Sequence, residues 1–346
     1  MLIPLFKYKS LFVILGLAFL SLFFIYWFFF SPPSGPLITK SIMIKKGSSL
    51  KKVSLMLKQE GIIRNASFFV SLASFLGKKR ELKAGEYEFH SRMHPWEVLT
   101  ILARGQTKPR LITIAEGLTV LQIAQLLDEL EIVEKKAFLK KASSPALVLS
   151  LGLPYSVTSS PGPPLEGYLF PNTYHLLKEM SSEEIIQMMV QQFKKVFNHD
   201  WIQRASQLGM SVKEVVTLAS IIEKETALSE ERPFISAVFH NRLRRKIPLQ
   251  SDPTVIYGIK NFNGNLTRTD LQRPSPYNTY LMNGLPPTPI CNPGKDSLHA
   301  ALNPSPVSYF YFVSKNDGSH HFSSTIEEHN QAVWRYQKGG VRKATK

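Results

Sequence analysis

Cysteine is almost absent from this sequence, since Cys291 is the only one among 346 residues. This excludes an intramolecular disulfide and any metal site built from several cysteines, so packing must stabilise the fold. The sequence also lacks an H-E-x-x-H motif and a G-x-S-x-G motif, and its glycines form no phosphate-binding loop. Metalloprotease, serine-esterase and nucleotide-binding chemistry therefore have no support, and we expect neither a cofactor nor a metal.

Acidic residues are scarce relative to basic ones: 26 Asp and Glu stand against 42 Lys and Arg, a formal net charge of +16. Such an excess predicts an anionic partner, namely nucleic acid, phospholipid headgroups or a carboxylate-bearing polymer. Apolar residues make up 44% of the chain and charged residues 20%, a balance typical of globular domains. The composition leaves the choice among the three partners open.

Charge is missing altogether from residues 11–30, LFVILGLAFLSLFFIYWFFF. This run of 20 residues is long enough to cross a bilayer as a helix, and longer than the apolar segment of most cleaved signal peptides. A cleaved signal sequence is the alternative. Lys7 and Lys9 precede the run and favour a cytoplasmic N-terminus at residues 1–10, although three lysines soon after it weaken that argument.

We therefore predict a single-pass protein of the cell inner membrane, with its N-terminus cytoplasmic and its body in the periplasm. An exported body argues against nucleic acid as the partner. It leaves the surface of the inner membrane and the cell-wall polymer as the anionic partners.

The rest of the chain is predicted to be an α+β protein in several parts. Residues 31–40 form a Pro-rich linker, and residues 41–155 contain short, mixed segments. Residues 160–337 contain longer helices and form the predicted catalytic domain, and residues 338–346 are a basic tail. The Ser- and Pro-rich stretch 156–164 is the predicted boundary between the two larger parts.

One internal repeat with an offset of 70 residues runs through the region 41–155. In each copy a strand end precedes a glycine turn, a Ser or Thr at a helix start and an amphipathic helix. The matching positions are Ile44, Gly47, Leu50, Val53 and Leu57 in the first copy and Ile114, Gly117, Val120, Ile123 and Leu127 in the second. The pattern predicts two tandem α+β modules, with coincidence between two generic patterns as the alternative. The first copy, residues 46–63, also resembles a LysM module, a common glycan-binding unit.

The most informative predicted helix covers Val212–Thr226. Apolar residues occupy most of its circumference, so it should be buried in the centre of a domain. Glu223 and Glu225 lie at its end, where burial would raise the pKa of a carboxyl group and suit it to general-acid catalysis. The two residues are about 200° apart on the helical wheel, so they cannot act as one catalytic pair. Periodicity does not tell which one is the acid, and a salt bridge to a nearby Arg or Lys is the alternative for either.

The end of this helix, ASIIEKET at 219–226, resembles the signature of the YceG-like endolytic murein transglycosylases (MltG). Other matches occur in the order found in that family: LEGYLFPNTY at 165–174, FHNRL at 239–243, LQSDPTVIYG at 249–258, SPYNTY at 275–280, GLPP at 284–287, NPG at 292–294, YFV at 311–313 and the segment 320–330. The resemblance is dense over residues 160–335 and loose over 40–155, and it includes the N-terminal span.

The resemblance implies an endolytic lytic transglycosylase, which cleaves the β-1,4 bond between N-acetylmuramic acid and N-acetylglucosamine in nascent glycan strands. The reaction leaves a 1,6-anhydro end and terminates strand elongation. Glu225 would be the catalytic acid, protonating the glycosidic oxygen and then acting as base toward the muramic 6-hydroxyl. No carboxylate nucleophile is required, unlike in most glycosidases. Peptidoglycan strands are the implied substrate, and peptidoglycan synthases and elongation or division complexes are the implied partners.

Six further residues match the family's motifs and are predicted to bind sugar hydroxyls and N-acetyl groups: Glu166, Gln250, Asp252, Tyr277, Asn278 and His320. Several have a plainer alternative. Asp252 precedes a proline and suits a turn. Tyr277 and Asn278 suit a structured loop, and Glu166 and Gln250 suit buried structural anchors.

Three histidines near the C-terminus, His320, His321 and His329, suggest a metal site, but without clustered cysteines or H-E-x-x-H a role in the substrate cleft or in structure is favoured. Two other functions remain open at this point. One is a non-catalytic peptidoglycan-binding scaffold of the wall-synthesis machinery. The other is a hydrolytic muramidase that uses Glu225, Asp252 and water.

Overall fold

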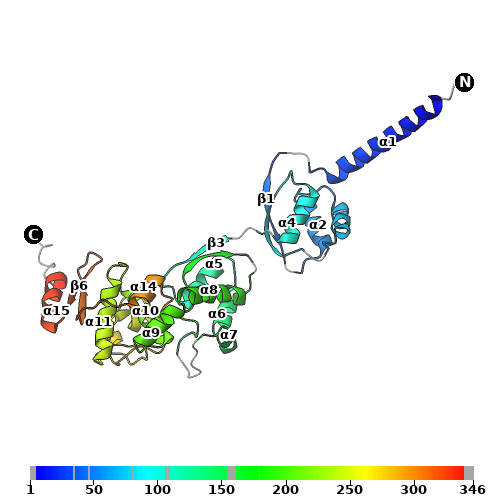
Figure 1. The fold of residues 1–346 in the computed structure, drawn as a ribbon. Coiled ribbons are helices and arrows are strands. Elements are labelled where there is room, and N and C mark those ends of the chain that lie inside the picture. The colour runs from blue at the N-terminus through cyan, green and yellow to red at the C-terminus, as the bar shows by residue number, and fades with distance from the viewer. Residues whose placement is uncertain are drawn as a thin grey trace, which may run out of the picture. The chain divides into compact units, whose positions relative to one another are not determined.

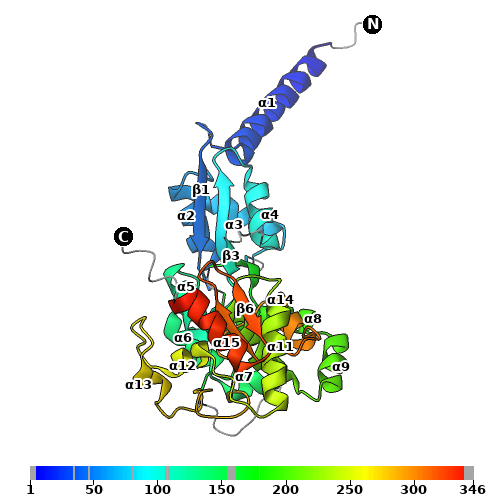
Figure 2. The same cartoon turned by 90° about the vertical axis from the view of Figure 1, so that its left-hand side faces the viewer.

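The computed structural model describes the chain except for residues 1–4, 34–35, 46, 80–81, 106, 108–109, 154–160, 179 and 339–346. Parts of the predicted linker, of the predicted boundary and of the basic tail therefore lie outside the described residues. The chain divides into two compact units, one made of residues 1–110 and 175–179 and the other of residues 111–174 and 180–346 (Figures 1 and 2).

The first unit begins with a long helix, α1 Leu5–Phe30, which contains the uncharged run predicted to span the membrane. Among the residues that the structure describes, however, no helix combines the length and the apolar character needed to cross a membrane. The helical state of residues 11–30 agrees with the prediction, and the spanning role stays a prediction.

The body of the first unit is a small α+β module. Its elements are β1 Thr39–Ile44, α2 Leu50–Gln59, α3 Ala66–Phe75, β2 Gly85–His90 and α4 Pro95–Arg104. The strands pair antiparallel, from Thr39 opposite His90 to Ile44 opposite Gly85. Apolar side chains of all five elements form one core, with Phe69, Tyr87 and Phe89 as its largest buried members. This core satisfies the requirement that packing alone, without disulfides, should hold the module together.

The second copy of the predicted repeat adopts the same local structure. It corresponds to β3 Arg110–Ile114 and α5 Val120–Glu129, and it is followed by α6 Lys135–Ala142, α7 Pro145–Ser150 and β4 Asn172–Leu176, which pairs with β3. Gly47 and Gly117 both take a positive φ, 80° and 77°, which favours glycine. After each helix the chain turns back through an equivalent backbone hydrogen bond of 2.9 Å, from Ile62 to Leu57 and from Ile132 to Leu127. The repeat is thus confirmed as two strand-turn-helix units.

The second copy is bonded to a loop far away in the sequence. Gly117 donates to the carbonyl of Asn292 and Asn292 donates to the carbonyl of Leu118, both at 2.9 Å. The two compact units divide after Arg110, so this copy and the loop belong to the same unit. The domain boundary near 156–164 stays a prediction.

The remainder of the second unit is mainly helical. Its elements are α8 Ser182–Val196, α9 His199–Gln207, α10 Val212–Glu225, α11 Arg232–Arg244, α12 Asp252–Gly258, α13 Arg268–Leu271, α14 Lys295–Leu302, the hairpin β5 Tyr311–Ser314 and β6 His320–Ser323, α15 Ile326–Val333 and a π-helical turn η1 Trp334–Lys338. Figure 2 shows α15 beside β6, and the two elements are in contact. With three two-stranded sheets among the described residues, the protein belongs to the α+β class, as predicted.

The predicted central helix is α10, and it lies in the core. All residues from Val215 to Ile222 are buried, and the helix contacts α9, α11, α12 and α14 (Figure 1). Ser211 and Glu214 form the expected capping box, with each side chain accepting from the other residue's backbone N–H. The helix therefore begins where the sequence predicts, and its two terminal carboxylates lie at the edge of the core.

Candidate active site

Glu225 is the last residue of α10, because Thr226 adopts an extended backbone with φ −145°. Its side chain borders a cavity of about 280 Å³. The residues around this cavity come from six regions of the chain: Glu225, Arg242, Leu249, Gln250, Asp252, Tyr280, Phe312 and His329. The cavity thus joins the end of α10 to α11, the start of α12, the loop before Leu281, β5 and α15.

The electrostatic surroundings of Glu225 favour its neutral form. The pKa of this carboxyl group is raised to about 7, mainly by burial and also by the nearby carboxylate of Asp252, which together outweigh the lowering by a hydrogen bond from Ser251 and by the charge of Arg242. Glu225 therefore retains a proton at a much higher pH than an ordinary glutamate does. A carboxylic acid that is protonated at its working pH and borders a cavity can serve as a general acid.

A short loop holds Glu225 in place. Ser251, which is buried, donates its hydroxyl to Glu225 Oε1. The loop is tied to a neighbouring one, since Ser251 N donates to Thr279 Oγ1 at 3.0 Å and Gln250 N donates to the Thr279 carbonyl at 3.0 Å. Gln250 also adopts a left-handed backbone conformation with φ 53°, which is unusual for a residue other than glycine. Such local strain is stable only where the surrounding contacts determine it, as they do here.

Arg242, on α11, borders the cavity. Its Nε donates to the carbonyl of Phe310 at 2.7 Å, and its Nη1 donates to the carbonyl of Leu249 at 2.8 Å and to Gln250 Oε1 at 3.2 Å. No ion pair among the described residues includes Glu225, so the structural alternative of a salt-bridged Glu225 is not found there. Arg242 instead organises the backbone around the cavity.

Glu223 has different surroundings. Its Oε1 lies 3.1 Å from Arg232 Nη2, and its Oε2 accepts from the backbone N–H of Gly294 at 2.9 Å. Only 6% of the Glu223 side chain is exposed, and it does not border the cavity. The ion-paired role that the sequence left open for both glutamates therefore belongs to Glu223 alone.

Of the six predicted substrate-binding residues, Gln250 and Asp252 border the cavity with Glu225. Asp252 is exposed and accepts a hydrogen bond of 2.6 Å from the Tyr280 hydroxyl. Both residues can reach a ligand placed next to Glu225, because their polar groups lie on the walls of the same cavity.

Glu166 and Tyr277 border a different hollow of about 660 Å³. Glu166 is fully buried and accepts from Val120 N at 3.0 Å and from the Tyr257 hydroxyl at 2.9 Å. Burial raises the pKa of Glu166 to about 7, although both hydrogen bonds lower it. The Tyr277 hydroxyl lies 2.6 Å from Thr288 Oγ1.

Asn278 and His320 border neither of these two hollows. Asn278 donates from Nδ2 to the carbonyls of Leu271 at 3.0 Å and Arg273 at 2.8 Å, which folds the loop before Tyr280. His320 Nδ1 lies 2.6 Å from Glu231 Oε2. Both side chains are therefore engaged by protein groups and do not border the cavity.

Four residues of the cavity were not predicted from the sequence as site residues: Arg242, Leu249, Tyr280 and Phe312. A fifth, His329, was predicted only to lie in the substrate cleft or to have a structural role. All five lie inside the family motifs, so proximity to the predicted residues within each motif was the available signal. Among the described residues no group of three or more His, Cys, Asp or Glu side chains comes together as a metal site would require.

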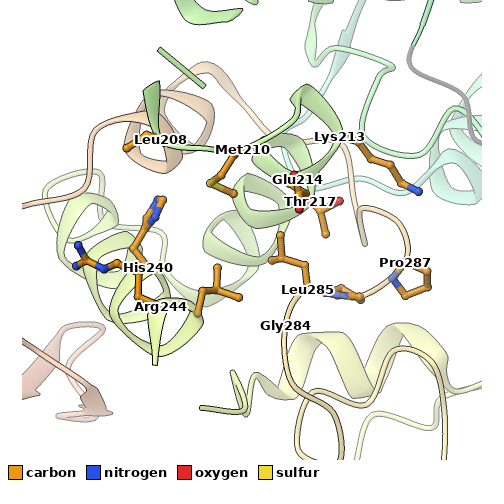
Figure 3. A pocket seen from close by; sticks show the side chains of 12 residues that line it. Leu208, Met210, Lys213, Glu214, Thr217, His240, Arg244, Gly284, Leu285 and Pro287 are labelled. Atoms are coloured by element: carbon orange, nitrogen blue, oxygen red, sulfur yellow. The ribbon is translucent and has the colours of Figure 1, made fainter. Parts of the chain in front are cut away.

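A larger cavity of about 510 Å³ lies at the opposite end of α10 (Figure 3). Leu208, Met210 and Leu285 contribute apolar walls, and Lys213 and Arg244 contribute positive charge. Its one carboxylate, Glu214, is used in the capping box of α10. Two carboxyl groups beside cavities have a pKa raised to about 7, Glu166 and Glu225. Glu166 accepts hydrogen bonds from Val120 N, Tyr257 and Asn292, whereas among the described residues Glu225 accepts one, from Ser251. The smaller cavity is therefore the candidate active site, because its acid is the less committed to protein partners.

Comparisons with known proteins concern the chain as a whole. The model of the YceG-like family matches residues 42–335. An endolytic murein transglycosylase of Bacillus subtilis is 34% identical over 307 residues, covering 86% of this chain and 85% of that protein. One from Streptococcus pneumoniae is 29% identical over 318 residues, and the match covers 85% of this chain but 57% of that longer protein. A crystal structure of a YceG-like protein from Listeria monocytogenes has a TM-score of 0.60 and 36% identity, covering 86% of this chain and 100% of that one.

Proposed function

The chain belongs to the YceG-like family, and from this membership we infer that it is a lytic transglycosylase acting on the glycan strands of peptidoglycan. The observation that supports an active site at the end of α10 is Glu225, an acid with a raised pKa that borders a cavity. We propose that Glu225 is its catalytic acid and that the cut falls within the strand, at the β-1,4 bond between N-acetylmuramic acid and N-acetylglucosamine.

In the proposed reaction a single carboxyl group acts twice. Protonated Glu225 donates its proton to the glycosidic oxygen, and the bond between that oxygen and C1 of the muramic residue breaks. The muramic 6-hydroxyl then bonds to C1, and the Glu225 carboxylate takes the hydroxyl proton, which restores the starting state. No water is consumed, and the product carries a 1,6-anhydro end. The pKa of about 7 suits both steps, because the group gives and takes a proton near neutral pH.

Hydrolysis by two carboxylates fits the cavity less well. It would need a second carboxylate as base or nucleophile, and Asp252 is the only other one on the cavity wall. Asp252 is exposed and already accepts a hydrogen bond from Tyr280. We assign Asp252 and Gln250 to substrate binding, with Glu166 and Tyr277 contacting a more distant part of the strand. Asn278 and His320 would support these residues from behind.

Product analysis tests the proposal. The full-length protein, purified in detergent, is incubated with uncrosslinked glycan strands, and the products are analysed by mass spectrometry. We expect ends lighter than hydrolytic ends by one water, lost in Glu225→Gln and largely kept in Glu223→Gln. Ordinary reducing ends would indicate a muramidase, and uncut strands would indicate a binding scaffold.

We propose further that residues 11–30 anchor the protein in the inner membrane, with residues 1–10 cytoplasmic and the remainder periplasmic. The support is the uncharged run of 20 residues within α1. An anchor would confine the cut to nascent strands, close to peptidoglycan synthases and the elongation or division complexes. A reporter that works only in the periplasm, fused to the C-terminus, should be active. Activity of a cytoplasmic reporter at the same position would overturn this topology.

The module at residues 39–104 is proposed to bind glycan, as its resemblance to LysM suggests. Three exposed lysines on α2, Lys51, Lys52 and Lys58, support binding to a polymer that carries carboxylates. Replacing all three with Glu should weaken binding of glycan strands at low salt. Unchanged binding would argue against a role of these three lysines in glycan binding.

A further inference from the structure

His329, on α15, is the one histidine on the wall of the cavity that contains Glu225. Its ring stacks on Tyr311, with the centroids 5.2 Å apart and the planes at 26°. The guanidinium of Arg242 lies 5.2 Å from the centroid of the same tyrosine ring. Tyr311 therefore orients both a histidine and an arginine at the cavity.

The hydrogen bonding of His329 is incomplete. Its Nδ1 is buried and has no hydrogen-bond partner among the described residues. No described residue bonds to its Nε2, and this atom is not among the buried atoms that lack a partner. A buried N–H without an acceptor is rarer and less favourable than an unpaired acceptor. The proton of the neutral ring is therefore assigned to Nε2, the nitrogen left accessible at the cavity wall.

The neutral state of His329 follows from its surroundings. Burial lowers the pKa of His329, and the positive charge of Arg242 lowers it further. The ring thus carries one N–H near neutral pH, and it does not compete with Glu225 as a proton source.

Arg242 supplies a second donor of the same kind. It is 8% exposed, and its Nε and Nη1 are used by protein carbonyl oxygens, whereas no described residue accepts from its Nη2. Nη2 is also absent from the buried atoms that lack a partner, so it is accessible. Two groups that can only donate therefore line the same cavity. Such a pair favours a ligand group that only accepts, a carbonyl or carboxylate oxygen, over a hydroxyl group.

We propose that His329 is a substrate-binding residue, whose Nε2–H donates, with Arg242 Nη2 beside it, to a carbonyl-type oxygen of the sugar held next to Glu225. The proposal rests on the proposed function of the cavity. In a peptidoglycan strand such oxygens occur in the N-acetyl group and in the lactyl group of muramic acid. Either would position the sugar relative to the acid.

The test measures binding separately from cleavage. Uncrosslinked glycan strands are titrated onto the full-length Glu225→Gln protein in detergent micelles, alone and combined with His329→Ala, His329→Gln or His329→Asn. The amide nitrogen of Gln reaches about as far as Nε2, and that of Asn reaches only as far as Nδ1. His199→Ala, at an exposed position of α9, is the matched control. Thermal unfolding of each variant checks that the fold is retained.

We expect His329→Ala to weaken binding roughly fivefold to tenfold, the effect of one lost hydrogen bond, with His199→Ala unchanged. His329→Gln should bind within about threefold of the parent, and His329→Asn should resemble His329→Ala. With Glu225 intact, the loss should appear in KM more than in kcat. Unchanged binding in His329→Ala, or rescue by Asn and not by Gln, would overturn the proposal.

Two substrate changes distinguish the sources of the oxygen. Strands without N-acetyl groups should remove the difference between His329→Ala and its parent if the acetyl carbonyl is bound. Strands stripped of stem peptides, which carry a free lactyl carboxylate, should enlarge that difference if the lactyl group is bound. A difference unaffected by both changes would overturn the proposal. Cleavage retained in Glu225→Gln with the His329 effect intact would instead contradict the assignment of the acid alone.

Discussion

Replacement of Glu225 by Gln should change how the stability of the protein depends on pH. In the native state the pKa of Glu225 is about 7, against an ordinary value of 4.5, mainly because of burial. The native protein thus binds this proton more tightly than the unfolded chain does. The stability that Glu225 contributes is fully present below about pH 4.5, and it is lost as the pH rises through about 7. Gln cannot ionise, so the variant avoids this loss.

The size of the effect follows from the two pKa values. At about 1.4 kcal/mol for each tenfold change in proton affinity, the wild-type protein should lose roughly 2 to 3 kcal/mol between pH 5 and pH 8 through this group. The free energy of unfolding of Glu225→Gln, relative to wild type, should rise by that amount over the same range. The substitution also changes the hydrogen bond to Ser251. If that change in stability does not depend on pH, it adds the same amount to the difference between the two proteins at pH 5 and at pH 8.

Urea denaturation at pH 5, 6, 7 and 8, followed by tryptophan fluorescence, measures this difference. The other buried carboxyl with a raised pKa, Glu166, is present in both proteins, so its contribution cancels. A constant difference between the two proteins across the four pH values would refute the reasoning, because it would show that Glu225 ionises in the native state as easily as in the unfolded chain.

Three further predictions concern the same region. The kcat/KM for strand cleavage should fall about tenfold per pH unit above pH 7, as Glu225 loses its proton. In Ser251→Ala this fall should begin at a pH higher by roughly 0.5 to 1 unit, because the Ser251 hydrogen bond lowers the pKa of Glu225. A pH–rate profile of Ser251→Ala that matches the wild-type profile would contradict the role of Ser251. Glu223→Gln should destabilise the protein by roughly 1 to 3 kcal/mol in urea denaturation, since it removes the nearest and most buried of the three carboxylates around Arg232 and leaves Glu116 and Asp296 at 3.7 Å, yet the folded fraction should still cut glycan. Glu166→Gln should also gain stability relative to wild type from pH 5 to pH 8 in the same assay, and a gain at pH 5 as large as at pH 8 would argue against a raised pKa.

Local features of the fold could be predicted from the sequence because they depend on neighbouring residues. The capping box of Ser211 and Glu214 determines where α10 begins, and the apolar circumference of that helix requires a buried position. The repeat was visible for the same reason, since Gly47 and Gly117 each permit a turn that other residues disfavour.

The division into units could not be predicted in this way. It depends on hydrogen bonds between Gly117 or Leu118 and Asn292, which are more than 170 residues apart, as the bond from Asn292 Nδ2 to Leu118 shows with a separation of 174. The Ser- and Pro-rich composition near residue 160 predicts a loop, and a loop does not by itself separate two domains. Composition reports where the chain lacks regular structure, whereas tertiary pairing decides which segments fold together.

The contacts that form the walls of the cavity could not be predicted from the sequence for a related reason. Ser251 is 26 residues from Glu225, and Arg242 contacts a carbonyl 68 residues away. Neither contact follows a helical or strand period, so no pattern in the sequence indicates it. The family motifs identified the segments that form the cavity, but they did not show which residues of each segment border it.

The contrast between Glu223 and Glu225 shows what geometry adds to such a motif. Two residues apart on a helix point in nearly opposite directions, so a helix that ends at the edge of a core must give them different surroundings. One side of α10 offers Arg232 and the backbone N–H of Gly294, which bind the two carboxylate oxygens of Glu223 and fix its position. The other side offers a hydroxyl, a cavity and little compensating charge, which leave Glu225 able to exchange a proton. A single helix end can therefore supply both an ion-paired carboxylate, Glu223, and a proton-donating acid, Glu225. Because the two residues are two positions apart, they point to different sides of the helix, and the ion pair of Glu223 does not include Glu225.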